Sequence, residues 1–482
     1  MVDRFQTHRS RLAEIVGTEG IAVIPAATET IRNDDVSHRF RQDSNFVYLT
    51  GFEEPDAVCV IAPGHPDGDY TLFVRPRDPE MEAWNGYRAG VEGARAQHEA
   101  DAAYEISELD EVLTRLMVGR SVLWYRMGDA GHDSRMTGLL ARARAYRDRS
   151  GQVAPDTVKD VSVALGELRL VKSETEIESL RAACLLSAEG HREAMRFARP
   201  DLYEYQVQAA MEYVWREGGS PRNGYPSIVA SGPNNCILHY VENDRRIEEG
   251  DLMLIDAAAE IDHYSSDITR TFPASGQFTA PQRALYEVVL AAQQAGFEAA
   301  RPASTIEAVH HAATRILTEG LCELGFLPRG VEDSLAMHHY RQFFFHGTSH
   351  WLGLDVHDRG AYRLGGSSRK LEPGMAFTVE PGLYVDASRP TRSFPLLEYD
   401  QDQWTLERVL QGEAARKRQT EALEQAEQVE WNVPEEFLGL GIRIEDDLLI
   451  TEDGHENLSS HVPASIEGIE ALCAETSWLV RG

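Results

Sequence analysis

Three histidines in one short apolar segment are the first residues in this sequence whose types and spacing could perform chemistry. His346, His350 and His357 lie four and seven residues apart in "FFFHGTSHWLGLDVHD", residues 343–358. A single histidine in such a segment is more often a packed core residue than a ligand. Three together favour metal binding or substrate contact, provided that other ligand-type side chains lie nearby.

Four carboxylates in strand-like, otherwise apolar runs supply such partners. Asp256 ends the apolar alternation of "DLMLIDAAAEI", and Asp267 opens "DITRTF". Glu380 and Glu445 lie in "AFTVEPGLY" and "GIRIEDDLLI". Taken singly, Asp267 would be a turn or cap residue, and each glutamate an edge-strand acid or an ion-pair partner. Buried carboxylates held close together repel each other, so that one takes up a proton unless a cation lies between them.

The four carboxylates and one imidazole form a ligand set suited to two divalent cations. Their negative charges offset those of two such ions, and a bridging hydroxide would complete a two-metal hydrolytic centre. An oxygen-dominated shell with a single nitrogen favours a hard ion, so we expect Mn²⁺, with Zn²⁺, Co²⁺ and Fe²⁺ also compatible. The sequence contains no HExxH motif, which excludes a zincin-type protease.

The elements that must hold these side chains are strands joined by tight turns. The runs "DLMLIDAAAEI" and "GMAFTVEPGLYV" predict strands flanked by turn residues. If Asp256 and Asp267 lie on the two strands of a hairpin, their carboxylates converge on one point. Upstream, "SETEIESLRAACLLSAEGHREAMRFARP" predicts a long helix that begins with a capping box from Ser173 to Glu176.

The first third of the chain predicts a separate domain of alternating strands and helices. "GIAVIPA", "AVCVIAP" and "YTLFVRP" indicate strands, and "EISELDEVLTRLM" has helical spacing. The polar, turn-rich stretch "YRDRSGQVAPDT" follows, and 482 residues are more than a single core usually supports. We therefore expect an α+β protein with two domains, residues 1–165 and 166–482, and a boundary near 155–170.

Residues 386–434 form a highly polar segment within the second domain. Part of it, "LERVLQGEAARKRQTEALEQAEQ", is dense in helix-forming residues. An apolar stripe on this helical segment would pack on the body or on a second subunit, whereas a solvated helical excursion is the alternative. The residues of that stripe are Trp404, Leu406, Val409, Leu410 and Leu423.

Charge and cysteine content exclude several classes of function. The formal net charge is -31, whereas nucleic-acid binding relies on a positive surface; the arginines between residues 135 and 149 are expected to form a solvated helix face. Five scattered cysteines without CxxC spacing argue against a disulfide framework or a cysteine-ligated zinc site. No signal peptide or run of about 18 apolar residues is visible. We therefore expect a cytoplasmic protein with no membrane partner.

The motifs occur in the order of a known family. "LIDAAAEIDHYSSDITRTFP", "HGTSHWLGLDVHD", "VEPGLY" and "GIRIEDD" resemble the aminopeptidase P branch of the pita-bread metallopeptidases, which is related to prolidase, methionine aminopeptidase and creatinase. "FRQDSNFVYLTGFEEPDAV" is similar to the N-terminal domain of that branch. The resemblance covers nearly the whole chain except residues 386–434, an insertion relative to the shorter bacterial pattern. It implies a creatinase/aminopeptidase P-type α/β domain followed by a pita-bread catalytic domain.

The resemblance also implies roles for individual residues. The residues that match the metal ligands are Asp256, Asp267, His350, Glu380 and Glu445, of which Asp267 and Glu445 would bridge the two ions. The residues that match catalytic or substrate-contacting positions are His239, His346 and His357. Further matches on the substrate side or behind the ligands are Thr269, Tyr384, Arg443 and Trp84, the last of which resembles an aromatic residue that reaches a neighbouring subunit's site in tetrameric relatives.

The activity implied by the resemblance is metal-dependent hydrolysis of the N-terminal Xaa-Pro bond of peptides by a metal-bridging hydroxide. The substrates would be peptides with proline in the second position. The protein would be a homo-oligomer, a dimer or a tetramer, whose N-terminal domain serves oligomerisation and substrate access. Two alternatives stay open: a prolidase restricted to Xaa-Pro dipeptides, and a non-catalytic binding protein with the pita-bread fold. The presence of all five ligand positions disfavours the second.

Overall fold

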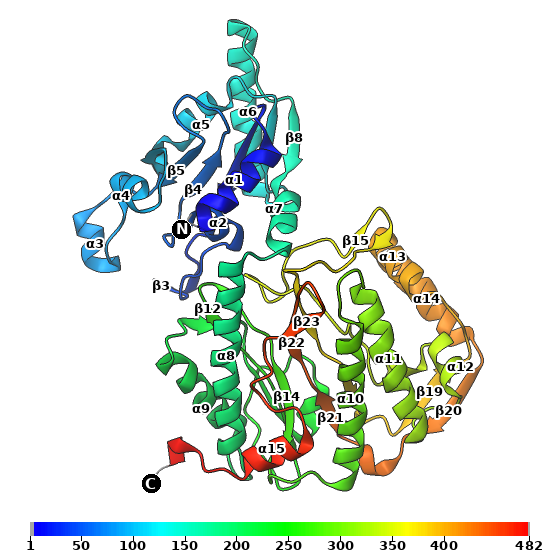
Figure 1. Cartoon of the computed structure of the whole chain (residues 1–482). Helices are drawn as coiled ribbons and strands as arrows, with labels where there is room; N and C mark the ends of the chain where they lie inside the picture. The colour runs from blue at the N-terminus through cyan, green and yellow to red at the C-terminus, as the bar shows by residue number, and fades with distance from the viewer. Residues whose placement is uncertain (1–3, 481–482) are drawn as a thin grey trace. The chain divides into compact units, whose positions relative to one another are not determined.

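The computed structural model describes residues 4–480, and the chain divides into two compact units, Met1–Arg169 and Leu170–Gly482. Each unit encloses buried apolar side chains of its own. Both contain helices and strands (Figure 1), which confirms the predicted α+β class. No helix within residues 4–480 is long and apolar enough to cross a membrane.

The first unit is built on a six-stranded mixed sheet with the strand order β6-β5-β4-β1-β7-β8. Strand β1 pairs antiparallel with β4 and parallel with β7. The strands are β1 (Gly20–Pro25), β4 (Val58–Ile61), β5 (Tyr70–Val74), β6 (Ala102–Glu105), β7 (Val122–Tyr125) and β8 (Thr157–Asp160), and a separate hairpin consists of β2 (Ile31–Asn33) and β3 (Val36–Ser37). The helices are α1 (Arg4–Val16), α2 (Ser44–Thr50), α3 (Pro79–Asn85), α4 (Gly90–Gln97), α5 (Leu109–Met117), α6 (Ala130–Ser150) and α7 (Val161–Leu170).

Helix α5 shows why this unit follows its sequence pattern. Its apolar residues Leu109, Val112, Leu113 and Leu116 recur at the spacing of one helical face, and all four are buried. Burial of each such side chain contributes about 1.5–3 kcal/mol relative to leaving it exposed. The strands β1, β4 and β5 also lie where the apolar runs predicted them, and the arginine-rich segment forms part of α6.

The second unit combines small antiparallel sheets with long helices. Figure 1 shows α8 beside α9 and α10 beside α11, and both pairs are in contact. The helices are α8 (Glu174–Phe197), α9 (Glu204–Glu217), α10 (Ala280–Ala299), α11 (Ile306–Glu323), α12 (Val331–Ala336), α13 (Gln401–Gln411), α14 (Glu413–Gln425) and α15 (Ile466–Cys473). The sheets have the orders β10-β11-β14, β13-β12-β9, β17-β22-β23, β18-β21, β19-β20 and β15-β16.

The strands of these sheets are short, and the apolar ones alternate with turns along the chain. Their bounds are β9 (Arg222–Asn223), β10 (Ile228–Ser231), β11 (Leu252–Asp256), β12 (Ala259–Ile261), β13 (Tyr264–Ser265), β14 (Thr269–Pro273), β15 (Arg363–Leu364), β16 (Ser367–Ser368), β17 (Ala376–Val379), β18 (Gly382–Tyr384), β19 (Thr391–Pro395), β20 (Gln428–Asn432), β21 (Gly441–Arg443), β22 (Asp446–Ile450) and β23 (His455–Asn457). Every residue of β10, β11, β14, β17 and β22 is buried, so these strands provide a rigid base for the side chains at their ends.

Helix α8 begins as its sequence predicts. The backbone N–H of Ser173 donates to the Glu176 carboxylate at 2.8 Å, and the two residues form the predicted capping box. A Cβ at Gly190 would lie 2.2 Å from Nε1 of Trp215. Glycine at this position is therefore what allows α8 to approach α9 so closely.

Helices α13 and α14 occupy about half of the polar segment 386–434. The antiparallel pair β19–β20 closes the base of this helical hairpin, with Pro395 opposite Gln428; the sequence pattern did not indicate that strand pair. Leu406, Val409 and Leu410 are 58%, 76% and 73% exposed. This part of the stripe therefore does not pack on the part of the chain that the structure describes.

Candidate active site

Antiparallel pairing brings four carboxylates to one end of two sheets. Asp256, the last residue of β11, lies opposite Thr269 of β14, and Thr269 in turn bridges to Glu445. Glu445 directly precedes β22, whose first residue pairs with the last residue of β17, and Glu380 follows directly after β17. Strands β11 and β14 do pair antiparallel, but β12 and β13 lie between them in the chain, so they are not a simple hairpin. Asp267 lies two residues before β14 rather than on the strand, where the sequence pattern predicts it.

The predicted ligands surround a pocket of about 400 Å³. Nε2 of His350 lies 3.2 Å from Oδ2 of Asp267 and 3.5 Å from Oε1 of Glu380. Ligand-type atoms of Asp267, His350 and Glu445 all lie within 4.8 Å of one another. Nδ1 of His350 donates to the Trp351 carbonyl at 3.1 Å, so Nε2 is the ring nitrogen that faces the carboxylates.

The charges of this cluster call for a cation. Burial and the neighbouring Asp267 raise the pKa of Glu380 to about 7, although His350 opposes the shift. Burial, followed by the charges of the other acids, raises the pKa of Glu445 well above its usual value. Oε1 of Glu445 is buried and has no hydrogen-bond partner among the described residues. A buried acceptor of this kind is costly unless a cation or a donor meets it.

Tyr225 connects two of the acids and was not singled out from the sequence. Its hydroxyl lies 2.6 Å from Oδ1 of Asp256 and 2.6 Å from Oδ1 of Asp267. Because it carries one proton, it donates to one carboxylate at a time. The available signal is its place in "NGYPS", three residues before β10, which pairs with β11 so that Ile228 lies opposite Asp256.

Arg443 lines the same pocket and orients two of the predicted ligands. Its Nη2 donates to Oδ2 of Asp256 at 2.6 Å, and its Nε donates to Oγ1 of Thr269 at 3.1 Å. The Thr269 hydroxyl in turn donates to Oε2 of Glu445 at 2.7 Å. One buried guanidinium therefore orients two of the predicted ligands, one directly and one through a hydroxyl.

A second chain of hydrogen bonds leads from Arg443 to a histidine. Nη1 of Arg443 donates to the Tyr384 hydroxyl at 3.0 Å, and that hydroxyl donates to Nε2 of His346 at 2.8 Å. Nδ1 of His346 donates to the Gly347 carbonyl at 2.7 Å. Burial and the charge of Arg443 lower the pKa of His346 to about 3, so its ring is neutral.

The remaining predicted residues lie at different distances from the cluster. The ring of His357 packs edge-on against His350, with centroids 4.4 Å apart, and burial lowers its pKa. His239 lines the same pocket from an exposed position. Trp84 lies on α3 in the first unit and is 82% exposed. The structure therefore brings all the predicted site residues of the second unit together, and Trp84 stays a prediction.

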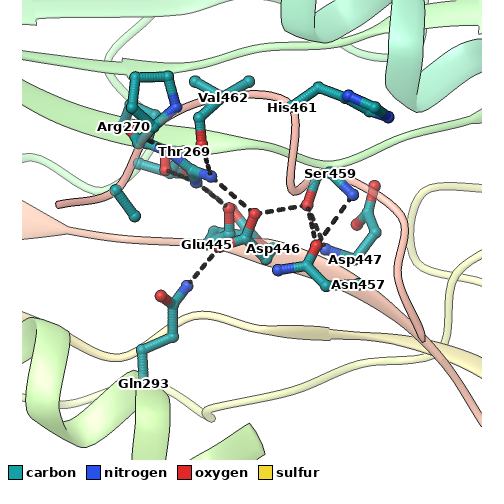
Figure 2. Close-up of polar contacts among 12 residues, drawn as sticks. Thr269, Arg270, Gln293, Glu445, Asp446, Asp447, Asn457, Ser459, His461 and Val462 are labelled. Carbon is teal, nitrogen blue, oxygen red and sulfur yellow. Dashed lines mark hydrogen bonds and ion pairs between the residues drawn. The ribbon is translucent and has the colours of Figure 1, made fainter. Parts of the chain in front are cut away.

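Figure 2 shows a buried network behind Glu445 that the sequence pattern did not predict. Nη2 of Arg270 donates to Oδ1 of Asp446 at 2.7 Å, and its Nη1 donates to the Glu445 carbonyl at 2.6 Å. Ser459 and Gln293 donate to the two oxygens of Asp446 at 2.5 Å and 2.9 Å. This network holds the backbone of Glu445 and so sets where its carboxylate can reach. The only sequence signal is the adjacent acids in "RIEDD".

Asp447 holds the backbone of Asp267, as the Arg270 network holds that of Glu445. The backbone N–H of Asp267 donates to Oδ2 of Asp447 at 2.9 Å, and the Cys184 thiol donates to the same oxygen at 3.2 Å. Burial and the charge of Asp267 raise the pKa of Asp447 well above its usual value. Cys184 thus acts as a buried hydrogen-bond donor in this site.

A second pocket of about 490 Å³ shares lining residues with the first. His346, Ser349 and Tyr362 border both pockets. Helix α13 contributes Gln401 and Thr405 to the lining of the second. The polar helical hairpin therefore lies next to the mouth of the candidate site.

Comparison with known proteins agrees with this geometry. Residues 178–452 match the metallopeptidase family M24, and residues 5–124 match the N-terminal domain of aminopeptidase P. The chain is 38% identical to the Xaa-Pro aminopeptidase of Escherichia coli over 97% of both chains. It is 31% identical to the human Xaa-Pro aminopeptidase 3 over 96% of this chain and 82% of that protein.

Solved structures give the same result for the fold. An aminopeptidase of Pseudomonas aeruginosa matches with a TM-score of 0.86 and 41% identity, covering 98% of this chain and 97% of that one. A zinc-substituted Escherichia coli aminopeptidase P in complex with product matches with a TM-score of 0.85 and 38% identity, over 98% and 97% of the two chains. The chain therefore belongs to metallopeptidase family M24, with an N-terminal domain of the aminopeptidase P type followed by a pita-bread domain.

Proposed function

We propose that this M24 metallopeptidase is an aminopeptidase that hydrolyses the N-terminal bond of peptides with proline in the second position. The observation that carries the proposal is the convergence of four carboxylates and one imidazole on one pocket, with Asp267, His350 and Glu445 offering ligand atoms within 4.8 Å of one another. The relatives named Xaa-Pro aminopeptidase, which align over nearly the whole chain, support the choice of substrate.

The donor set fits two divalent ions, and membership of the family implies such ions. Asp256, Asp267, His350, Glu380 and Glu445 would hold these ions, and Asp267 and Glu445 would contribute to both. The predominance of oxygen donors supports Mn²⁺ over Zn²⁺, Co²⁺ or Fe²⁺. When bound, the ions would lower the pKa of water and polarise the carbonyl of the scissile bond.

The protein side chains around the ligands would bind and orient the peptide. The ring of His346 is neutral, and its Nε2 is held by the Tyr384 hydroxyl at 2.8 Å. It can therefore contact the substrate without adding positive charge to the site. His357 and His239 line the pocket and are assigned to contact the scissile peptide. Because proline has no N–H to donate, such contacts must reach its ring and carbonyl instead.

Prolidase activity is the alternative within the same family. A prolidase must recognise the free carboxylate of a dipeptide, whereas an aminopeptidase must leave room for the chain beyond proline. The active-site pocket adjoins the pocket lined by α13 and so continues past His346, which supports the aminopeptidase. A non-catalytic binding protein is disfavoured because all five ligand-type residues are present and lie together.

Further proposals concern the parts outside the catalytic centre. We propose that residues 1–165 and 166–482 act as the N-terminal and catalytic domains, that the first serves oligomerisation and substrate access, and that the protein is a dimer or tetramer in which Trp84 reaches a neighbouring subunit. The insertion 386–434 would limit substrate length, since α13 lines the adjoining pocket. Five free cysteines support a cytoplasmic location, and the net charge of -31 supports a function without nucleic acid.

The deciding experiment measures release of the N-terminal amino acid from an X-Pro dipeptide, an X-Pro-Y tripeptide and a longer X-Pro peptide. Metal-stripped protein is assayed with and without added Mn²⁺. Manganese-dependent cleavage of the tripeptide is the expected result. Cleavage of the dipeptide alone would assign a prolidase, and no cleavage of any substrate with Mn²⁺, Zn²⁺, Co²⁺ or Fe²⁺ would favour the binding protein.

A further inference from the structure

A third pocket in the catalytic unit, of about 650 Å³, has an unusual concentration of positive charge. Arg341, Arg389 and Arg392 line it, in a chain whose net charge is -31. Arg341 belongs to a short 3-10 helix (His339–Gln342), while the other two lie at the start of the insertion. We call this cavity the arginine pocket.

Arg392 is the residue that most needs a partner. It is only 2% exposed, and its Nε is buried without a hydrogen-bond partner among residues 4–480. Its guanidinium stacks over the Phe343 ring, 5.4 Å from the centroid, and this face provides no hydrogen-bond acceptor. Burial, followed by the charge of Arg389, lowers the pKa of Arg392. A buried cation in such surroundings is costly unless an anion meets it.

The only carboxylate among the described residues that line this pocket does not neutralise it. Asp386 accepts hydrogen bonds from the backbone N–H and the hydroxyl of Ser388, at 2.9 Å and 2.7 Å. It forms no close ion pair with the three arginines in the described chain, although its charge partly offsets those of Arg389 and Arg392. The lining of the pocket therefore carries more positive than negative charge.

The arginine pocket adjoins the catalytic centre through one residue. Tyr384 lines the pocket, and its hydroxyl also binds His346 and Arg443 in the active site. Phe345 and Ile237, which are 43% and 52% exposed, form apolar walls of the same cavity. A group with an apolar body and a negatively charged end would match these walls and the guanidinium groups beyond them.

We propose that the arginine pocket is a subsite for a carboxylate of the peptide substrate. Arg392 and Arg341 would bind the carboxylate through charge-assisted hydrogen bonds, while Phe345 and Ile237 contact the side chain beside it. The proposal rests on the proposed peptidase function and names the substrate class further: peptides with an acidic group beyond the scissile bond. That group is either the C-terminal carboxylate of a short peptide or an acidic side chain of a longer one.

The test compares KM for X-Pro peptides of three to six residues, each as the free acid and as the C-terminal amide. A parallel set of amides carries Glu or Gln at each position after proline. At one position or length, loss of the negative charge is expected to raise KM of the wild type about tenfold or more, the size expected of a charged hydrogen bond. A difference within the first set shows that the pocket binds the C-terminal carboxylate. A difference within the second set shows that it binds an acidic side chain.

Variants then connect this preference to the pocket. In Arg392→Gln the ratio of the two KM values is expected to fall towards one, whereas Arg392→Lys should retain part of it. If Arg392→Gln does not fold, Arg341→Gln replaces it, because Arg341 is less buried. The ratio of the two KM values is expected to fall in this variant as well. Arg416→Gln removes a charge from the exposed face of α14 and should keep the full ratio.

Two results would overturn the inference. One is a wild type that cleaves acids and amides, and Glu and Gln peptides, with equal KM. The other is a preference that survives in folded Arg392→Gln and Arg341→Gln. Failure of the wild type to cleave any peptide with Mn²⁺, Zn²⁺, Co²⁺ or Fe²⁺ would instead refute the peptidase assignment itself.

Discussion

At Tyr225, one hydroxyl serves two carboxylates that would otherwise repel each other. The phenol touches Asp256 and Asp267 at 2.6 Å each, so it fixes their separation before any ion binds. Such partners of a ligand orient it and raise the affinity of the site for metal. The residue belongs to the site as much as the ligands do, although it has no charge at neutral pH.

Tyr225→Phe is expected to weaken the binding of Mn²⁺ by about 10- to 100-fold, because the two ligands lose their common donor. Metal affinity is measured by titration of the stripped protein, and turnover is followed on an X-Pro-Y tripeptide. Tyr213→Phe removes a hydroxyl from a residue that is 50% exposed and serves as the control. An affinity equal to that of the wild type would show that the hydroxyl does not organise the ligands.

Glu445→Gln is expected to abolish most turnover, by about 100-fold or more, yet to leave the metal-free protein at least as stable as the wild type. The substitution removes one of four buried carboxylates that repel each other, but it also removes a ligand charge. The midpoint of thermal unfolding is compared with and without Mn²⁺, and the metal-induced increase should shrink. Glu452→Ala, at an exposed position after β22, should change neither value. Full activity of Glu445→Gln would refute the ligand assignment.

At the scale of elements, the register of the strands positions the acidic side chains of the site. Strands β11 and β14 carry Asp256 and Thr269 side by side, Thr269 bridges to Glu445 just before β22, and Glu380 follows β17 at the same end. Because side chains alternate along a strand, a slip of one residue would turn Asp256 or Thr269 away from the pocket. The buried Arg270 network in Figure 2 ties β14 to the start of β22 and so protects that register.

Arg270→Met is expected to lower the free energy of unfolding by about 3–5 kcal/mol, because it leaves the buried Asp446 without its cation. The side chains of the pair are only 1% and 2% exposed. Arg315→Met breaks a surface pair with Glu332, with side chains 48% and 77% exposed, and should have a much smaller effect because water screens exposed charges. Denaturant unfolding of the metal-free proteins measures both. Equal effects for the two variants would contradict a special role of the buried pair.

At the scale of the whole molecule, the helical hairpin α13–α14 borders the pocket that adjoins the candidate site. Its base is closed by β19 and β20, and the backbone N–H of Leu396 still donates to the Glu427 carbonyl at 2.8 Å. The hairpin can therefore be removed beyond this point without cutting a strand. What remains would keep Arg392, because it lies on β19.

Replacement of residues 397–426 by Asn-Gly, a two-residue turn that suits paired strands, tests the role of the hairpin. We expect kcat/KM of a ten-residue X-Pro peptide to rise about tenfold relative to that of a tripeptide, which corresponds to about 1.4 kcal/mol of removed hindrance. Both values are measured on the same preparation, with the tripeptide as internal control. An unchanged ratio would show that α13 does not restrict substrate length.

The sequence alone determined the residue types of the proposed ligands, the helix start at Ser173, the strand that ends at Asp256 and the strand that follows Glu445, because these features depend on local spacing and on apolar runs. It also pointed to the family through motifs that span most of the chain. The match of each assigned role to its residue stays a proposal, but the residues of the catalytic unit do lie together.

Only the tertiary structure decided which distant groups support the ligands. Tyr225, Arg270 and Asp447 lie in segments whose local pattern is ordinary, and their contacts arise from pairing between residues far apart in the chain. The exposure of Leu406 and the burial of Arg392 could not be predicted from the sequence either. Side-chain burial depends on what folds over a residue rather than on its neighbours in sequence. The arginine pocket, built from three separate segments, could be seen only once those segments were in place.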